Sequence, residues 1–451
     1  MGSYAELYVG AFQVWSWKSY VDRSGTSLFL ESDRRVYERG GGDQPNRVVE
    51  PDHADEPETA HKYVATVRQI IDRLDIMGFT LPRVRQLFQR AKREQLAHYE
   101  RMQFGFGWYQ TDAAVLRRLT FGRWIEGARA VLTQDVAALS SPARLPNLRW
   151  FHTEGSAFGD PDAPDERFFL RALLEAATPD ALVVLDYTDL VGSGYYDPAA
   201  RLTWEPPPRP GGYLADDVII ILTEGTSDAA LIAKSIALRY PHLAGYYRFP
   251  DFAAGKAPGG AAALVNTIKA FVAAGVRNPV IGLFDNDTAG KVALQALEPV
   301  HLPPNVQVRR LPDLKLARRY PRVGAQGSLT MNVNGRAAGV ELYFGADVLR
   351  GPDGSLDPIE WGGQDRGSRE YQGELRDKHA VQSRYSDLLD GIVAGSVDSS
   401  THDWTGIDAL CAMLFRVFSS DPPLPVRPRP RRARGWPESS SRSGRSVRGW
   451  H

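Results

Sequence analysis

The stretch Val218-Ile-Ile-Ile-Leu-Thr-Glu-Gly-Thr-Ser-Asp228 decides the fold class. An all-apolar run is typical of a buried strand of a parallel sheet. Here the run is followed by an acid and a glycine, and then by apolar residues at helical spacing. Similar strands are predicted at 218–222, 245–249, 280–284 and 306–310, with helices over 228–238, 261–274 and 288–297 between them. This alternation predicts an α/β domain, a mostly parallel sheet flanked by helices on both faces.

Two of these predicted strands end in acids. Glu224 follows the first strand, and Asp285 and Asp287 follow the third. Because ligands bind at the carboxyl ends of parallel strands, we expect the three carboxylates to converge. Their mutual repulsion and lost hydration would be relieved by a hard divalent cation with oxygen ligands. The pattern predicts Mg²⁺ or Mn²⁺ rather than zinc, because no His or Cys lies nearby.

The residues around the acids suit the same site. Gly225 and Gly290 permit close backbone approach at the two turns. Ser227 and Thr288 are expected to cap the helices that follow, whose N-terminal ends favour a phosphate. The alternative is structural, since an Asp at the end of a strand is often only the N-cap of the next helix.

The sequence before residue 206 is more mixed. We predict strands at 5–9, 12–17 and 181–185, helices over 61–77, 82–96, 116–139 and 168–177, and a loop over 40–58. Residues 1–205 therefore predict an α+β N-terminal domain. The segment Pro206-Pro-Pro-Arg-Pro-Gly-Gly212 cannot continue a helix or a central strand, so we place a linker at 206–213.

The C-terminal part is less regular. Residues 346–420 predict an extension of the second domain, with a hairpin around Pro352-Asp-Gly354 and helices over 375–389 and 405–418. The tail, 421–451, holds eight arginines and two acids, a net charge of +6, and its composition predicts disorder. It is either a dispensable tail or an electrostatic contact for nucleic acid or an acidic partner.

Composition excludes several classes of protein. The 54 Lys and Arg residues balance the 54 Asp and Glu residues, which argues against a uniformly basic nucleic-acid wrapper. The single cysteine, Cys411, excludes intrachain disulfides and zinc sites built on Cys pairs, and we expect it to be a small buried hydrophobe. No signal peptide, membrane span or P-loop motif is visible, so we expect a cytoplasmic protein that does not contact membranes and has no built-in P-loop ATPase.

The two acid-bearing stretches carry a resemblance. Leu222-Thr-Glu-Gly-Thr-Ser-Asp228 and Phe284-Asp-Asn-Asp-Thr-Ala-Gly290 resemble the two signatures of the Toprim domain, over roughly 214–310. The resemblance implies that Glu224 is the general acid/base, that Asp285 and Asp287 hold Mg²⁺, and that Asp228 is a further ligand.

Three other residues are candidates for the same site. Glu341 lies in a strand-like segment after a Gly/Asn-rich loop, within a predicted Toprim domain over 214–345. Toprim nucleases of the OLD type often use a later carboxylate, so Glu341 is a candidate metal ligand or else an ordinary strand residue. Gly225, Ser227 and Lys291 are candidates for substrate binding, with a solvated surface lysine as the alternative for Lys291.

The rest of the chain narrows the choice among Toprim proteins. It lacks the Cys-based zinc module of primases and the P-loop ATPase of OLD nucleases, and it is too short for a topoisomerase. It resembles the HEPN/Toprim-associated family through Gly2–Val9, Trp15–Tyr20, Leu28–Arg34 and Leu185–Leu190. That resemblance implies an N-terminal sensor joined to an effector of a bacterial conflict or phage-defence system, with a second copy or a defence-system protein as a partner.

The predicted function is Mg²⁺- or Mn²⁺-dependent hydrolysis of phosphodiesters, with RNA and DNA both open as substrates. One alternative is a regulatory module that binds nucleotide or nucleic acid without cleaving it. Another is a metal-independent HEPN-type ribonuclease, because Arg93 and His98 fit an Arg-x4-His pattern. The two side chains would lie about 140° apart around the helix and share no face.

Overall fold

A computed structural model gives the fold of the 451-residue chain. The structure describes residues 2–38, 59–101, 113–114, 116–134, 165–203, 218–250, 259–324, 327–364 and 371–418. The predicted loop over 40–58, the linker over 206–213 and the tail over 421–451 lie outside the described residues. The chain divides into a unit Met1–Ser419 and the remainder Ser420–His451.

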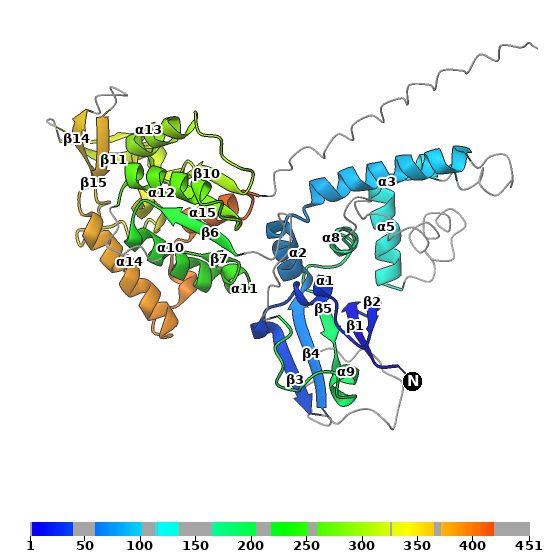
Figure 1. The fold of residues 1–451 in the computed structure, drawn as a ribbon. Helices are drawn as coiled ribbons and strands as arrows, with labels where there is room; N and C mark the ends of the chain where they lie inside the picture. The colour runs from blue at the N-terminus through cyan, green and yellow to red at the C-terminus, as the bar shows by residue number, and fades with distance from the viewer. Residues whose placement is uncertain are drawn as a thin grey trace, which may run out of the picture. The chain divides into compact units, whose positions relative to one another are not determined.

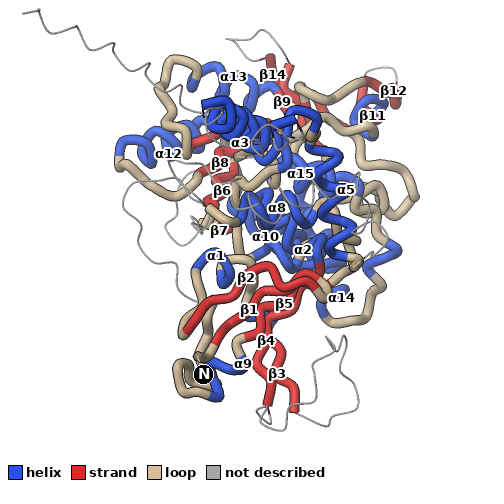
Figure 2. Tube along the Cα trace, turned by 90° about the vertical axis from the view of Figure 1, so that its right-hand side faces the viewer, coloured by secondary structure: helices blue, strands red, loops and turns tan. Residues whose placement is uncertain are grey.

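An antiparallel sheet of five strands, in the order β2-β1-β5-β4-β3, forms the first part of the fold (Figure 2). Its strands are β1 (Tyr4–Val9), β2 (Phe12–Lys18), β3 (Arg34–Glu38), β4 (Thr59–Thr66) and β5 (Leu182–Asp186). Strands β1, β2 and β5 confirm the predicted strands within one or two residues. Central strand β5 joins β1 to β4, so segments far apart in the sequence share this sheet.

The predicted helix over 61–77 is wrong in its first third. Residues up to Thr66 form strand β4, in which His61, Tyr63 and Ala65 are buried in alternation. A period of two, not 3.6, therefore governs this segment. Helix α2 (Val67–Ile76) begins only after Thr66, whose side chain accepts a hydrogen bond from Gln69 N in a capping box.

Helices pack on this sheet around one hydrophobic cluster that includes Leu7, Ile70, Phe88, Leu173 and Leu185. They are α1 (Arg23–Thr26), α2, α3 (Leu81–Arg101), α5 (Phe121–Leu132), α8 (Arg167–Leu174) and α9 (Thr188–Gly192), with a 3₁₀ turn at Glu31–Asp33. The helix predicted over 116–139 is interrupted at residues 119–120, which are not helical. The side chain of Thr120 then caps α5 by accepting a hydrogen bond from Arg123 N. Residues 135–139 lie outside the described part.

The second sheet is parallel and has the order β10-β8-β6-β7. Its strands are β6 (Ile219–Thr223), β7 (Tyr247–Arg248), β8 (Val280–Phe284) and β10 (Val306–Arg310), and the helices between them are α10 (Thr226–Arg239), α11 (Pro241–Ala244), α12 (Ala261–Ala273) and α13 (Thr288–Leu297). The predicted α/β alternation with a parallel sheet is confirmed.

Helices cover both faces of the parallel sheet, as Figure 1 shows for α10 and for α12 with α13. Ile221 of β6 packs with Ile232 of α10 in one cluster. Leu222, the next residue of β6, packs with Ile268 of α12 in another. From β6 the chain reaches β7 on one side and then crosses to β8 on the other. The carboxyl ends of β6 and β8 therefore flank the switch point where α/β sheets bind ligands.

A second four-stranded sheet, of order β12-β11-β14-β15, and a two-stranded pair, β9 with β13, follow the parallel sheet. Their strands are β9 (Asn286–Asp287), β11 (Tyr320–Gly324), β12 (Gly327–Met331), β13 (Ala337–Ala338), β14 (Ile359–Gln364) and β15 (Tyr371–Leu375). The remaining helical elements are η3 (Leu316–Arg319), η4 (Val340–Tyr343), α14 (Lys378–Val393), η5 (Ser399–Thr401) and α15 (Thr405–Leu414).

Two predictions in this region need correction. The segment around Glu341 is not a strand but the 3₁₀ turn η4, in which four consecutive residues are buried and no alternation remains. The helix predicted over 375–389 begins only at Lys378, because Leu375 ends strand β15 and pairs with Ile359. The hairpin predicted around Pro352–Gly354 is reduced to a turn, with a hydrogen bond of 2.8 Å from Gly351 N to Ser355 O and one isolated antiparallel bridge between Arg350 and Leu356 in place of paired strands.

Two further expectations concern single features. Cys411 is fully buried on α15, as predicted, and burial raises the pKa of its thiol. No helix in the described part of the chain is long and apolar enough to cross a membrane.

Candidate functional site

The carboxyl ends of β6 and β8 bring Glu224 and Asp285 together. The two strands pair in parallel, with Thr223 opposite Leu283, so each acid leaves the same edge of the sheet. The backbone N–H of Asp285 donates a hydrogen bond of 2.9 Å to Glu224 Oε1. The convergence expected from the sequence is therefore present for this pair.

Asp287 lies at the start of α13 and is held on both sides. Its Oδ1 accepts a 2.7 Å hydrogen bond from Gly290 N, and its Oδ2 accepts one of 2.6 Å from Gln372 Nε2. Asp287 is thus the N-cap of α13, as the structural alternative predicted, and the expectation that Thr288 caps this helix is wrong. The cap does not take Asp287 out of the acidic cluster, because its charge acts on both Glu224 and Asp285.

Asp228 and Glu341 extend the cluster from α10 and η4. Their side chains are almost completely buried, with Asp228 5% and Glu341 2% exposed. Gln382 Nε2 of α14 connects them, donating to Glu341 Oε1 at 2.7 Å and to Asp228 Oδ1 at 3.3 Å. Five carboxylates from β6, α10, the β8–α13 turn and η4 therefore share one neighbourhood.

Lys378 supplies a positive charge to this cluster from the first turn of α14. Its Nζ lies 3.0 Å from Glu341 Oε1. Burial opposes the charged ammonium, but the carboxylates of Glu341 and Asp228 outweigh it and raise the pKa of Lys378. The ammonium is thus the cation that partly balances the buried acids.

Burial and mutual repulsion raise the pKa values of three of the acids, Glu224, Asp285 and Asp228, toward the neutral form. Burial, followed by the charges of Asp287 and Asp228, raises the pKa of Glu224 to about 7, although the hydrogen bond from Asp285 N opposes the shift. Burial and then the Glu224 and Glu341 carboxylates raise the pKa of Asp285 well above its ordinary value. Burial also raises the pKa of Asp228, and Glu341 adds to this shift. The cluster therefore carries more potential negative charge than Lys378 alone can balance.

The donor set suits a hard divalent cation, because all four candidate ligands, Asp285, Asp287, Asp228 and Glu341, are carboxylates. Gly339 makes a close approach to two of these acids, because a Cβ atom there would stand 2.8 Å from Glu341 Oε2 and 3.6 Å from Asp285 Oδ2. However, no three or more His, Cys, Asp or Glu side chains of the described residues are arranged closely enough to hold a metal ion as they stand. Binding would therefore require the carboxylates to draw together, with Lys378 moving from Glu341.

The predicted glycines make close approaches that a larger residue would prevent. A Cβ atom at Gly225 would lie 2.5 Å from Asp228 Oδ2, and one at Gly290 would collide with the carbonyl oxygen of Asp285. Ser227 does not cap α10, because the N-cap is Gly225 and has no side chain to do so. Ser227 instead lies exposed beside Asp228, with its Oγ 3.4 Å from Asp228 Oδ1. Lys291 follows Gly290 on α13, and its contact with a phosphate stays a prediction.

Sequence reasoning missed Gln372, Lys378 and Gln382. The one signal available was the spacing of Lys378 and Gln382, because residues four apart lie on the same face of a helix. That spacing is common on solvated helices and does not point to a site. Gln372 gave no signal, since its partner Asp287 lies 85 residues away in the sequence.

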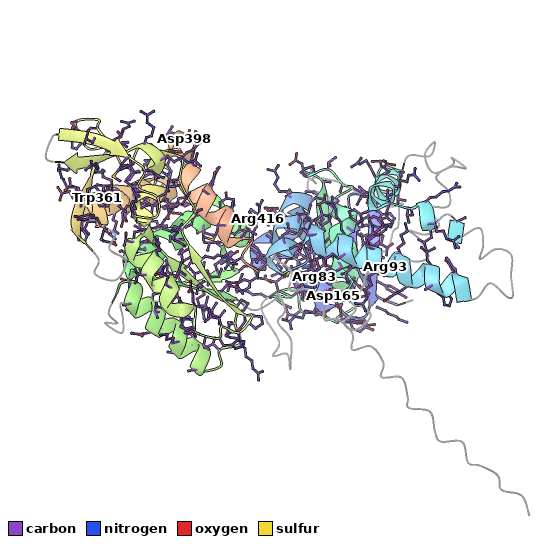
Figure 3. All side chains as sticks on the ribbon, turned by 90° about the horizontal axis from the view of Figure 1, so that it is seen from above. Arg83, Arg93, Asp165, Trp361, Asp398 and Arg416 are labelled. Atoms are coloured by element: carbon purple, nitrogen blue, oxygen red, sulfur yellow. The ribbon has the colours of Figure 1, made fainter. Side chains whose placement is uncertain are left out.

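Arg93 and His98, the alternative ribonuclease pair, both lie on α3, where Figure 3 labels Arg93. Arg93 Nε donates to the backbone oxygen of Gln89, one turn toward the start of the helix, at 3.2 Å. His98 follows Arg93 toward the end of α3, whereas Gln89 precedes Arg93. No contact in the described residues joins the two, and no observation favours this alternative.

Residues 1–207 match the family model described as HEPN/Toprim N-terminal domain 1. The match covers the predicted N-terminal domain and supports the HEPN/Toprim-associated family. No curated protein and no solved structure matches the chain significantly.

Proposed function

We propose that this chain is a Toprim-type nuclease that hydrolyses phosphodiesters of RNA or DNA with Mg²⁺ or Mn²⁺. The observation that carries the proposal is the junction of Glu224 and Asp285 at the switch point of a parallel sheet. Asp285, Asp287, Asp228 and Glu341 would hold the cation. When bound, the cation would polarise the scissile phosphate and lower the pKa of a bound water.

Glu224 is the proposed general acid/base. A carboxyl with a pKa of about 7 is partly protonated at neutral pH, so it can accept a proton from the attacking water or give one to the leaving oxygen. Asp285 N donates to one Glu224 oxygen and so orients the carboxyl group. Gly225, Ser227 and Lys291 are the proposed contacts for substrate phosphate, because they lie at the starts of α10 and α13.

The N-terminal match supports a place for this nuclease in bacterial conflict or phage defence, with the first domain as sensor. The chain would then act in the cytoplasm, with a second copy or a defence-system protein as its partner. The rival function is a regulatory module in which the same acids bind metal and nucleotide but cleave nothing.

The test is a cleavage panel with the full chain on tRNA, single-stranded DNA and duplex DNA, with Mg²⁺ or Mn²⁺ and with EDTA. We expect metal-dependent cleavage that falls by about 10² to 10⁴ in Glu224→Gln, the range for loss of a general acid/base. Glu298→Gln, an exposed Glu directly after α13, is the matched control and should cleave like the wild type. Metal-dependent cleavage undiminished in Glu224→Gln would contradict the mechanism, and binding without cleavage would favour the regulatory module.

A further inference from the structure

Charge is divided unevenly along the second half of the chain. Residues 306–338 hold seven Arg or Lys residues and one acid, a net charge of +6. The following residues, 339–418, hold 14 acids and seven Arg or Lys residues, a net charge of −7. A net charge near zero for the whole chain therefore conceals a strongly basic segment next to an acid-rich one.

The basic segment is attached to the acidic centre at both ends. At its start, β10 pairs with β8, Arg310 lies opposite Phe284, and Leu311 N donates to Phe284 O at 2.9 Å. At its end, β13 pairs with β9, with Ala337 opposite Asp287. The segment thus leaves the sheet beside Asp285 and returns beside Asp287.

The middle of the segment is held in place by its own hydrogen bonds. Leu314 and Asn334 exchange two, from Leu314 N to Asn334 Oδ1 at 2.9 Å and from Asn334 Nδ2 to Leu314 O at 3.0 Å. Val333 N also donates to Ala317 O at 2.8 Å. The cations on this segment are therefore carried by a backbone that is fixed relative to the carboxylates.

Six cations of the segment form what we call the basic rim: Arg310, Lys315, Arg318, Arg319, Arg322 and Arg336. Lys315, Arg318, Arg319 and Arg336 are exposed, and Arg310 and Arg322 are half-buried. Within the described residues, none of the six forms an ion pair. By contrast, the acid-rich segment provides partners for Arg239, Arg376 and Arg384 through Asp408, Glu360 and Asp357.

We propose that the basic rim binds the phosphates of a nucleic-acid strand and guides it to the carboxylate centre, an inference that rests on the proposed nuclease function. The five buried or half-buried acids repel a polyanion, so a strand needs flanking cations to approach them. Arg and Lys side chains that form no ion pair with another described residue supply them, because phosphate contacts give affinity without reading sequence. The strand enters over the β10–η3–β13 side and leaves the acid-rich α14 side uncovered.

The experiment measures binding without catalysis. Short fluorescein-labelled strands of RNA and DNA, single and duplex, are titrated with the full chain in EDTA, and anisotropy is followed from about 50 to 200 mM KCl. In the double variant Arg318→Glu/Arg319→Glu we expect affinity to fall at least about tenfold and the slope of log K against log salt to become shallower by about 1 to 2. The control Arg277→Glu, an exposed cation before β8 at the opposite edge of the sheet, should bind like the wild type.

Each outcome has a distinct meaning. Unchanged affinity and salt slope in the double variant would overturn the basic rim, even if the wild type cleaves nucleic acid. Binding that depends on the basic rim, without any metal-dependent cleavage, would support the binding role of the rim and refute the proposed nuclease function. If the double variant melts earlier than the wild type, Arg318→Gln/Arg319→Gln replaces it and should lose affinity in the same direction without charge reversal.

Discussion

At the scale of single residues, the site is a balance between five acids, three of them buried and two half-buried, and one ammonium. Glu224, Asp285 and Asp228 all have raised pKa values, and Lys378 is the cation closest to Glu341. The acids are destabilising where they stand, because burial and repulsion both disfavour their ionised forms. Such groups are retained at functional sites, where a ligand relieves the repulsion.

Replacing Lys378 should make the fold more dependent on a divalent cation. Without the ammonium the buried carboxylates lose their countercharge, so we expect Lys378→Met to melt earlier than the wild type in EDTA. Mn²⁺ should then raise the melting temperature of Lys378→Met more than that of the wild type, because the ion no longer competes with the ammonium. Thermal melting with and without Mn²⁺ measures both effects, and Lys269→Met, on the exposed side of α12, should match the wild type. Equal gains from Mn²⁺ in all three proteins would argue against the competition.

Raised carboxyl pKa values predict how stability depends on pH without metal. The folded state holds the Glu224 proton up to about pH 7, whereas the unfolded chain releases it near its ordinary pKa. The folded protein therefore binds more protons in this window, and the contribution of Glu224 to stability decreases as the pH rises through it.

Melting in EDTA from about pH 5 to 8 tests this sign. The wild type should become less stable as the pH rises, with Glu224 contributing roughly 2 to 3 kcal/mol of the change. Glu224→Gln should show a shallower decrease, while Glu298→Gln should keep the wild-type slope. A wild-type stability that rises with pH in EDTA would show that the buried acids do not control it.

At the scale of elements, the parallel sheet could be predicted and the elements that complete the site could not. Strands β6 and β8 are continuous apolar runs followed at once by acids, so both their type and their functional edge follow from local signals. The short turn η4 has no such signal, and the few apolar residues of strand β4 fit the period of a helix as well as that of a strand. Strand β15 and helix α14 reach the acids only through contacts with segments far away in the sequence.

Strand β15 is expected to position Asp287 through one side chain. Gln372 donates to Asp287 and accepts a hydrogen bond of 2.9 Å from Ala289 N, so it links the acid to the first turn of α13. We expect Gln372→Ala to weaken Mn²⁺ binding about 10- to 100-fold, as loss of a hydrogen bond to a metal ligand does. Calorimetric titration with Mn²⁺ measures this loss, and Gln295→Ala, at an exposed position later on α13, is the control. Unchanged Mn²⁺ affinity in Gln372→Ala would remove Gln372 from the site.

At the scale of the whole molecule, the buried apolar residues and the net charge are distributed differently along the chain. The buried apolar residues end at Val417, within three hydrophobic clusters. The net charge of +6 on residues 421–451 balances −6 on residues 1–420. The buried apolar residues of the described core thus all precede the tail in the sequence, while the charge balance of the chain depends on the tail.

Removing residues 421–451 should separate the stability of the fold from the electrostatic binding of nucleic acid. We expect an unchanged melting temperature, because the described core ends before the deletion. Binding to nucleic acid in EDTA should weaken at low salt and lose part of its salt dependence, because a net charge of +6 is removed. Anisotropy titrations over a salt series measure the change. A truncated chain that melts several degrees earlier would instead show that the tail contributes to the fold.

The sequence by itself determined the alternation of strands and helices over residues 218–310, the edge of the sheet that carries chemistry, and three acids that lie there. These features depend on short-range patterns, because a buried strand and the residue at its end are adjacent in the sequence. Tertiary structure alone decided which other groups reach those acids, namely Gln372, Lys378 and Gln382. It also decided that cations and carboxylates would flank one site, because that proximity comes from packing between distant segments, which no local pattern records.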